Sequence, residues 1–299
     1  MMRKNKSKWL AMTVGIVLLM SLACLSFAAD IEPVVTTDWL GQNLDKVVVL
    51  DIRKVEEYRA GHIPGAINVV YDSWAVKKGD LLNELPADDD LRDIISSTGI
   101  EATSSVVVVG KTDTMTDKVN ATRIAFTLKY AGVADVAVLS GGYNKWAADK
   151  KTVSTEAVRP RSKAFTGKFQ KDLVVKKNDV LAAIGKAVIV DTRDPDTFAG
   201  KKKLDFVAKA GHIKGAVLLE TTALYEADGT YKPKEAIAAL AAGVVGTDTS
   251  KEIIVYCDSG RVATAWWFML HEVLGYKNAK LYDGSMMDYA KDPAAPMEP

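Results

Sequence analysis

Short runs of consecutive apolar residues alternate with segments of helical periodicity along most of the chain. The runs VVVL, VVVV, VIV and IIVY would be apolar on both faces of a strand, as in a parallel sheet that helices cover on both sides. The segments PADDDLRDIISSTGI and KPKEAIAALAAGV carry acidic residues near their start and a glycine near their end, which is typical of helices. The pattern predicts an α/β fold whose sheets are mostly parallel.

The strand and turn pattern occurs twice. Residues 47–69 read as an apolar strand, Asp-x-Arg, an aromatic residue and Gly-His-Ile-x-Gly-Ala, and residues 187–219 repeat this order with a lysine-rich insertion that we expect to form a surface loop. Units of this length indicate duplicated domains rather than a solenoid, whose repeats are far shorter. The stretch TVSTEAVRPRSKAFTGKF between the copies is polar and lacks periodicity, as linkers do. We therefore predict a first domain over 30–151, a linker over 152–169 and a second domain over 170–294.

The first residues have the pattern of an export signal. Four basic residues precede an almost wholly apolar stretch over 9–27, and Ser26-Phe27-Ala28 supplies the small-x-small motif that signal peptidase recognises. We predict a signal peptide over 1–28, a periplasmic or secreted protein, and no membrane attachment after cleavage. Two alternatives are a retained membrane anchor, because the apolar stretch could just span a bilayer, and a lipoprotein, because Ala23-Cys24 resembles the end of a lipobox.

Signal cleavage would change both the charge and the cysteine count. The chain has 39 basic and 38 acidic residues, so loss of four basic residues leaves 35 against 38, a formal charge of −3. This near balance argues against a nucleic acid or an anionic lipid surface as partner. Cys24 would leave with the signal, and Cys257 alone could form no internal disulfide; it is either an inert buried thiol or a reactive one. Three histidines and one cysteine also make a poor zinc ligand set, so we predict neither metal nor cofactor.

Cys257 lies at the predicted carboxyl end of the strand IIVY, where open α/β sheets place their ligands. A tight polar loop follows it, and residues 262–274 have a helical pattern. We therefore expect the sulfur to lie in a cup of backbone N–H groups at a helix N-terminus, which binds anions and lowers the pKa of a thiol. Because the loop is polar and contains a glycine, we predict an accessible catalytic thiol. The predicted substrate contacts are Asp258, Ser259, Gly260, Arg261, Val262, Ala263 and Arg193.

Taken together, these motifs resemble the tandem-domain rhodaneses of the thiosulfate sulfurtransferase family. The resemblance rests on the two Asp-x-Arg motifs, the two Gly-His-Ile-x-Gly-Ala turns, the Cys257 loop and the Tyr-Asp-Gly-Ser turn over 282–285. It implies two rhodanese-like domains, the first catalytically silent, with Gly110 in the place that matches Cys257. It also implies a ping-pong reaction in which Cys257 takes the outer sulfur of thiosulfate, sulfite leaves, and cyanide or a thiol accepts the sulfur.

Competing functions can be compared on the same loop. Cysteine phosphatases have His before the cysteine and Arg six positions after it, where this chain has Tyr256 and Ala263. A redox oxidoreductase typically uses Cys-x-x-Cys, and Gly260 fills the second cysteine's position. A persulfide carrier with little turnover and a mercaptopyruvate-type sulfurtransferase both stay open. The loop departs from both enzyme patterns, with Asp258 and Thr197 where thiosulfate enzymes carry basic residues. Arg261 would replace that missing positive charge if it points into the cup.

Other conspicuous residues are expected to be structural. His62 and His212 occupy the same turn in both copies, including the silent one, so we expect them to hold the turns by hydrogen bonds. The Asp and Arg of each Asp-x-Arg motif are expected to pair with each other, with Arg193 a further candidate for facing the active cleft. The aromatic residues of the segment WWF over 266–268 are expected to lie in the core.

We expect protein purified from its native host to begin just after Ala28, because the apolar segment ends there in the motif that signal peptidase cleaves. N-terminal sequencing measures this directly. A chain that still starts at Met1, or one with a lipidated Cys24, would contradict cleavage at this position.

Overall fold

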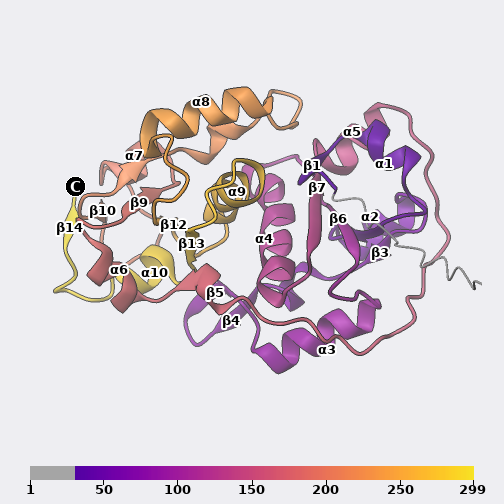
Figure 1. Ribbon diagram of the computed structural model, residues 1–299, viewed down its shortest axis with the longest axis horizontal. Helices are drawn as coiled ribbons and strands as arrows, with labels where there is room; N and C mark the ends of the chain where they lie inside the picture. The colour runs from indigo at the N-terminus through magenta and orange to yellow at the C-terminus, as the bar shows by residue number, and fades with distance from the viewer. Residues whose placement is uncertain (1–30) are drawn as a thin grey trace, which may run out of the picture.

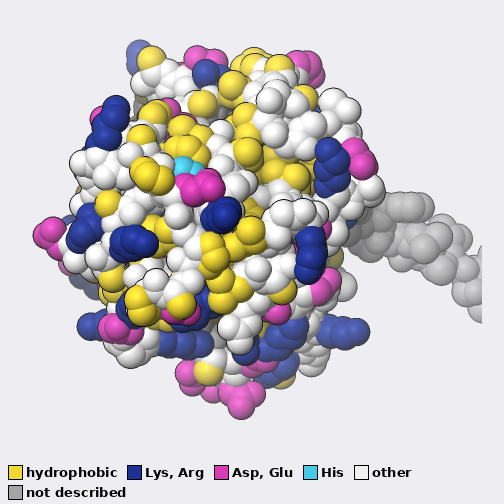
Figure 2. All heavy atoms as spheres, turned by 90° about the vertical axis from the view of Figure 1, so that its left-hand side faces the viewer, with side chains coloured by type: hydrophobic (Ala, Val, Ile, Leu, Met, Phe, Trp, Pro, Cys, Tyr) yellow, Lys and Arg dark blue, Asp and Glu magenta, His cyan; other side chains and the backbone are white. Residues whose placement is uncertain are grey.

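The computed structural model describes residues 31–299. The predicted signal peptide over 1–28 therefore lies outside the described residues. Between residues 31 and 299 no helix is both long and apolar enough to cross a bilayer. On the face at the second-domain end, basic and acidic side chains lie among each other, with apolar groups between them (Figure 2).

Each half of the chain contains a five-stranded parallel sheet (Figure 1). The strand orders are β1-β7-β6-β2-β3 and β11-β9-β12-β13-β8, and neighbouring strands run parallel throughout. The first sheet consists of β1 (Val34–Val35), β7 (Asp135–Leu139), β6 (Ser105–Val109), β2 (Val48–Asp51) and β3 (Ile67–Asn68). The second consists of β11 (Val217–Leu218), β9 (Val188–Asp191), β12 (Ile253–Tyr256), β13 (Ala279–Tyr282) and β8 (Val174–Val175). Read from opposite edges, the two orders match strand for strand, which confirms the predicted duplicated α/β fold.

Helices cover both faces of each sheet. They are α1 (Thr37–Gln42), α2 (Val55–Ala60), α3 (Asp88–Thr98), α4 (Met115–Ala131), α5 (Gly142–Ala148), α6 (Lys177–Ala183), α7 (Pro195–Phe198), α8 (Lys234–Val245), α9 (Ala263–Phe268) and α10 (Ser285–Tyr289). The first sheet packs on α3 and α4 on one face and on α1, α2 and α5 on the other. The second packs on α8 and α9 on one face and on α6, α7 and α10 on the other.

Short elements complete the fold. The hairpin strands are β4 (Val76–Lys78) and β5 (Leu81–Glu84), and a second two-stranded sheet pairs β10 (His212–Ile213) with β14 (Met297–Glu298). Three 3-10 turns span Tyr71–Ser73, Lys171–Leu173 and Thr221–Leu224. The helix expected over 262–274 is α-helical only in α9 and then widens into a π-helical turn, Met269–Val273, in which the N–H of Leu274 bonds to the carbonyl of Met269 at 2.9 Å.

The two domains share one apolar core. Helices α4 and α9 lie side by side between the sheets (Figure 1), and the largest apolar cluster includes residues of both sheets and both helices. Phe126 of α4 packs edge-to-face on Trp267 of α9, with ring centroids 4.6 Å apart. Trp266, Trp267 and Phe268 are fully buried, as predicted. The first domain is therefore part of the packing behind the Cys257 loop.

Polar contacts also cross between the domains. The fully buried Arg123 on α4 donates to the Asp283 carboxylate at 2.5 Å, and that carboxylate also accepts the backbone N–H of Leu85, just after β5, at 3.0 Å. Asn83 of the β4–β5 hairpin donates to the Ser259 hydroxyl at 3.0 Å. The first domain thus contacts both the Cys257 loop and the turn after β13.

Residues 152–169 run as an extended segment without helix or strand in the structure. Phe165 within this segment is only 2% exposed, and its N–H bonds to the Ser96 hydroxyl of α3 at 3.0 Å. The segment predicted as a polar linker is therefore packed against the first domain at Phe165.

The repeated histidines have structural roles, as predicted. His62 hydrogen-bonds the carbonyls of Tyr58 and Glu156 through its two ring nitrogens, at 2.8 and 3.0 Å, and stacks on the Tyr58 ring. His212 hydrogen-bonds the carbonyl of Phe198 at 2.9 Å and stacks on the Phe198 ring. Each histidine joins its turn to the helix before it.

We expect Arg123→Ala to lower the free energy of unfolding by about 3–5 kcal/mol, because it leaves the buried Asp283 carboxylate without its cation. Denaturant titration of the purified protein measures this change. Lys163→Ala is the matched control, because it removes a salt bridge to Glu101 in which both side chains are about half exposed, and such pairs contribute little. The interpretation is wrong if both variants unfold at the wild-type midpoint.

Candidate active site

Cys257 directly follows the central strand β12, which pairs with β9 and β13. The residue is only 1% exposed. The prediction of an accessible thiol is therefore wrong for this conformation: the side chain packs into the main apolar cluster beneath the loop. The other residues of the loop, 258–262, are themselves buried or only partly exposed, so the polar character of the loop did not indicate exposure.

Ser285 fixes the shape of the loop. Its hydroxyl accepts the N–H groups of Cys257 and Gly260 at 3.1 and 3.0 Å, and donates to the carbonyl of Tyr282 at 2.8 Å. The same hydroxyl lies 4.0 Å from the sulfur. The N–H of Met286 then bonds to the Cys257 carbonyl at 3.1 Å. The Tyr-Asp-Gly-Ser turn thus supports the Cys257 loop from one side.

Gly260 is required by close packing. Its φ is +72°, and a Cβ added there would come within 2.3 Å of the Asp283 carbonyl oxygen. Any side chain would therefore push the loop away from the turn after β13. This explains why the loop carries a glycine at this position.

The sulfur lies in the predicted cup of backbone groups. The N–H groups of Ser259 and Ala263 hydrogen-bond the sulfur, and the Ser285 hydroxyl lies near it; these contacts lower the pKa of the thiol. Burial opposes this effect most strongly, and the negative charge of Asp258 adds to it, so the pKa of the Cys257 thiol is raised overall. The expectation of a lowered thiol pKa is wrong, because an acidic residue follows the cysteine and the sulfur is desolvated.

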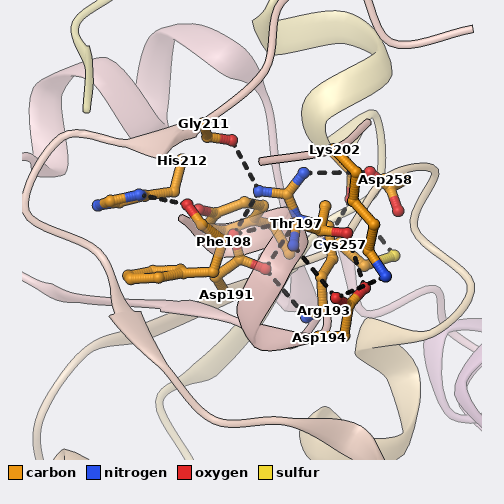
Figure 3. A network of polar contacts seen from close by, with 12 residues as sticks. Asp191, Arg193, Asp194, Thr197, Phe198, Lys202, Gly211, His212, Cys257 and Asp258 are labelled. Carbon is orange, nitrogen blue, oxygen red and sulfur yellow. Dashed lines mark hydrogen bonds and ion pairs between the residues drawn. The ribbon is translucent and has the colours of Figure 1, made fainter. Parts of the chain in front are cut away.

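Arg193 lies between two carboxylates (Figure 3). It donates to Asp191 at 2.6 Å and to Asp258 at 3.1 Å, and also to the Gly211 carbonyl at 2.9 Å. The equivalent Arg53 makes the same contact with Asp51 at 2.6 Å. The predicted pairing within each Asp-x-Arg motif is confirmed. In the second domain the arginine also compensates the charge of Asp258, so little of its positive charge remains for a ligand.

A pocket of about 160 Å³ opens beside the loop. Arg193, Asp258 and Val262, all predicted substrate contacts, line it, together with the acidic Asp194 and with Met115, the first residue of α4 in the first domain. The charged residues of its lining are therefore mainly acidic, although Lys202 pairs with Asp194 at 2.9 Å.

The other predicted contacts have separate roles. Arg261 lines a different cavity, in the first domain, and hydrogen-bonds Tyr71 there, so its predicted role in binding the donor next to Cys257 is not supported by its position. Ser259 and Ala263 contribute N–H groups to the cup, and Gly260 makes the turn.

Sequence reasoning missed two residues of the site. Ser285 stands in a quoted family turn, but nothing in the pattern pairs it with a cysteine 28 positions earlier. Met115 begins α4 after a loop over 111–114, which is no longer than the loop over 258–262 between Cys257 and α9. No local pattern therefore indicated that the first domain reaches the second domain's pocket.

Comparison with known proteins agrees with the fold and the motifs. A family model described as "Rhodanese-like domain" matches residues 36–149 and again residues 176–292. A relative from Saccharopolyspora erythraea, named "Putative thiosulfate sulfurtransferase", is 33% identical over 89% of this chain and 96% of its own length. "Sulfur carrier protein TtuD" from Thermus thermophilus is 30% identical over 86% of this chain and 93% of its own length.

A solved structure shares the fold. The anaerobic ergothioneine biosynthesis enzyme from Chlorobium limicola superimposes with a TM-score of 0.79 at 22% identity, covering 89% of this chain and 70% of that one. At this identity the likeness concerns the fold alone.

We expect Asp258→Asn to lower the pKa of the Cys257 thiol, because it removes the negative charge that disfavours the thiolate. More thiolate should then be present at neutral pH than in the wild type. The measurement is the pH titration of thiolate ultraviolet absorbance in protein that lacks the predicted signal peptide and hence Cys24. Asp194→Asn, which lines the same pocket, is the control and should titrate like the wild type. An unchanged or higher midpoint in Asp258→Asn would contradict this electrostatic account.

Proposed function

The chain belongs to the family of rhodanese-like domains, and from this we propose that it transfers the sulfane sulfur of thiosulfate through a persulfide on Cys257. The observation that carries the proposal is the cysteine at the carboxyl end of β12, in a loop that Ser285 holds and whose N–H groups form a cup around the sulfur. The first domain has Gly110 at the equivalent place and therefore no nucleophile there. The acceptor is cyanide or a thiol.

The first half-reaction conserves charge and electrons. The Cys257 thiolate attacks the outer sulfur of thiosulfate, a new S–S bond forms, and the bond between that sulfur and the sulfonate breaks. Sulfite departs with the electron pair, and the enzyme carries an anionic persulfide. In the second half-reaction the acceptor nucleophile attacks the outer sulfur, and the Cys257 thiolate leaves with the electrons of the S–S bond.

The cup supports both anionic states. N–H groups already aimed at the sulfur stabilise the thiolate and the persulfide without reorganisation during the reaction. The raised pKa of Cys257 opposes the reaction, since most of the thiol stays protonated at neutral pH. The reaction is therefore expected to speed up as pH rises toward the pKa of this thiol.

The pocket restricts the donor. A volume of about 160 Å³ suits a small molecule. The carboxylates of Asp194 and Asp258 oppose a dianion, while Arg193 is shared between Asp191 and Asp258. We therefore expect thiosulfate to bind weakly and to be turned over mainly at high concentration.

A second candidate is a persulfide carrier with little turnover. It is favoured by the buried thiol with its raised pKa and by the acidic residues that line the pocket, and a relative is named a sulfur carrier. A mercaptopyruvate-type activity is a less supported alternative, because Asp258 and Arg261 interrupt the run found after the cysteine in such enzymes. Periplasmic or secreted localisation stays part of the proposal.

We expect incubation with thiosulfate to increase the intact mass of the protein by one sulfur atom, because the first half-reaction leaves that atom on Cys257. Mass spectrometry before and after incubation measures the adduct, and thiocyanate formation measures turnover. Cys257→Ser should abolish both.

Thiocyanate formation that persists in Cys257→Ser would refute the assignment of the nucleophile. A stable adduct that neither cyanide nor thiols remove at an appreciable rate would instead select the carrier function. If mercaptopyruvate loads Cys257 with sulfur and thiosulfate does not, mercaptopyruvate replaces thiosulfate as the proposed donor.

A further inference from the structure

The first domain contains a cavity built on the same positions as the candidate active site. It has a volume of about 510 Å³ and opens at the carboxyl ends of β2 and β6. Its lining includes Arg53, Lys54, Tyr71, Asp72, Gly110 and Lys111. In the repeat these positions correspond to Arg193, Asp194, Thr221, Thr222, Cys257 and Asp258. Ligands of open α/β sheets bind at this edge, so the cavity occupies the ligand position of the first domain.

The two sites differ in charge and size. Lys54 and Lys111 stand where the second domain has Asp194 and Asp258. Gly110 stands in place of the cysteine, and a Cβ built there would meet nothing closer than Ile52 Cδ1 at 3.4 Å. The cavity volume is about 510 Å³ against 160 Å³. The silent site is thus larger, and the charge is reversed at these two positions, although acidic residues also line the cavity.

Each site also takes a residue from the other domain. Met115 of the first domain lines the pocket beside Cys257, and Arg261 of the Cys257 loop lines the cavity of the first domain. A molecule in the cavity would therefore contact the loop that carries Cys257.

Charged groups of both signs are available in the cavity. Lys111 is committed to Glu57 at 3.1 Å. Among the residues that the structure describes, no ion pair is formed by two of the lining cations, Lys54 and Arg261, or by three of the lining carboxylates, Glu56, Asp72 and Asp117. Two cations and three carboxylates can therefore each meet an opposite charge on a ligand.

One buried acceptor also points to a ligand. Asn120 of α4 lines the cavity, and its Oδ1 is buried with no hydrogen-bond partner within the described part of the chain. An unsatisfied buried acceptor is costly and calls for a donor. Because this oxygen is inaccessible to a water-sized molecule, the Asn120 amide must turn toward the cavity before an N–H group of a bound molecule can satisfy it.

We propose that this cavity binds a small zwitterion of peptide size. Its anionic group pairs with Lys54 and Arg261, its ammonium group faces Asp72, and an amide N–H donates to Asn120. The volume lies within the range of small-molecule sites, roughly 300–1,000 Å³, and exceeds what a single small anion needs. The proposal does not depend on sulfur transfer at Cys257.

The test uses S-methylglutathione, a tripeptide zwitterion without a free thiol, so that it cannot react with a persulfide. Isothermal titration calorimetry on the purified protein should show one site. Gly110→Leu should abolish binding, because its side chain enters the cavity, whereas Gly110→Ala should retain it, because the added methyl fits. Asn120→Leu should weaken binding about two- to tenfold, the cost of one neutral hydrogen bond.

Two further comparisons test the proposal even if Gly110→Leu does not fold. Lys54→Ala should weaken binding about tenfold and reduce its salt dependence. Glutarate, which has the anionic groups without the amine, should bind at least tenfold more weakly than S-methylglutathione. The proposal is overturned if S-methylglutathione does not bind at millimolar concentration, if Lys54→Ala and Asn120→Leu bind as the wild type does, or if glutarate binds equally well.

Discussion

The ion pair between Arg123 and Asp283 is the contact on which the candidate active site depends. It joins a fully buried guanidinium of the first domain to the turn after β13 of the second. That turn carries Ser285, whose hydroxyl holds the N–H groups of Cys257 and Gly260. Because breaking a buried pair leaves an uncompensated charge, the first domain, which lacks a nucleophile at Gly110, still fixes the loop in which the nucleophile of the second lies.

Electrostatics of the site work against the thiolate and in favour of a defined geometry. The N–H groups of the cup favour an anionic sulfur, but burial and Asp258 outweigh them. Arg193 compensates Asp258 and keeps it from turning elsewhere. These contacts hold the loop in a defined conformation, but they lower the fraction of reactive thiolate. This combination suits either a slow enzyme or a carrier that keeps its sulfur away from solvent.

Local features of the site could be predicted from the sequence. The apolar runs predicted the strands, the repeated Asp-x-Arg and Gly-His-Ile motifs predicted the internal pairings, and the end of IIVY predicted the place of Cys257. Each of these depends on residues a few positions apart, or on the common edge at which parallel strands end.

The remaining features depend on contacts between distant segments. Ser285 reaches a loop 28 residues earlier, and Arg123 reaches a carboxylate 160 residues later. The burial of Cys257, the direction of Arg261 and the anchoring of Phe165 follow from such contacts, which leave no periodic signal. The loop pattern alone consequently predicted an exposed thiol and an arginine beside it.

A crystal structure of the protein after reaction with thiosulfate tests the central claim most directly. The account predicts density for one additional sulfur atom bonded to Cys257 Sγ and within hydrogen-bonding distance of the N–H groups that form the cup. An unmodified Cys257 in protein shown to have reacted, or an added sulfur that points away from those N–H groups, would contradict it.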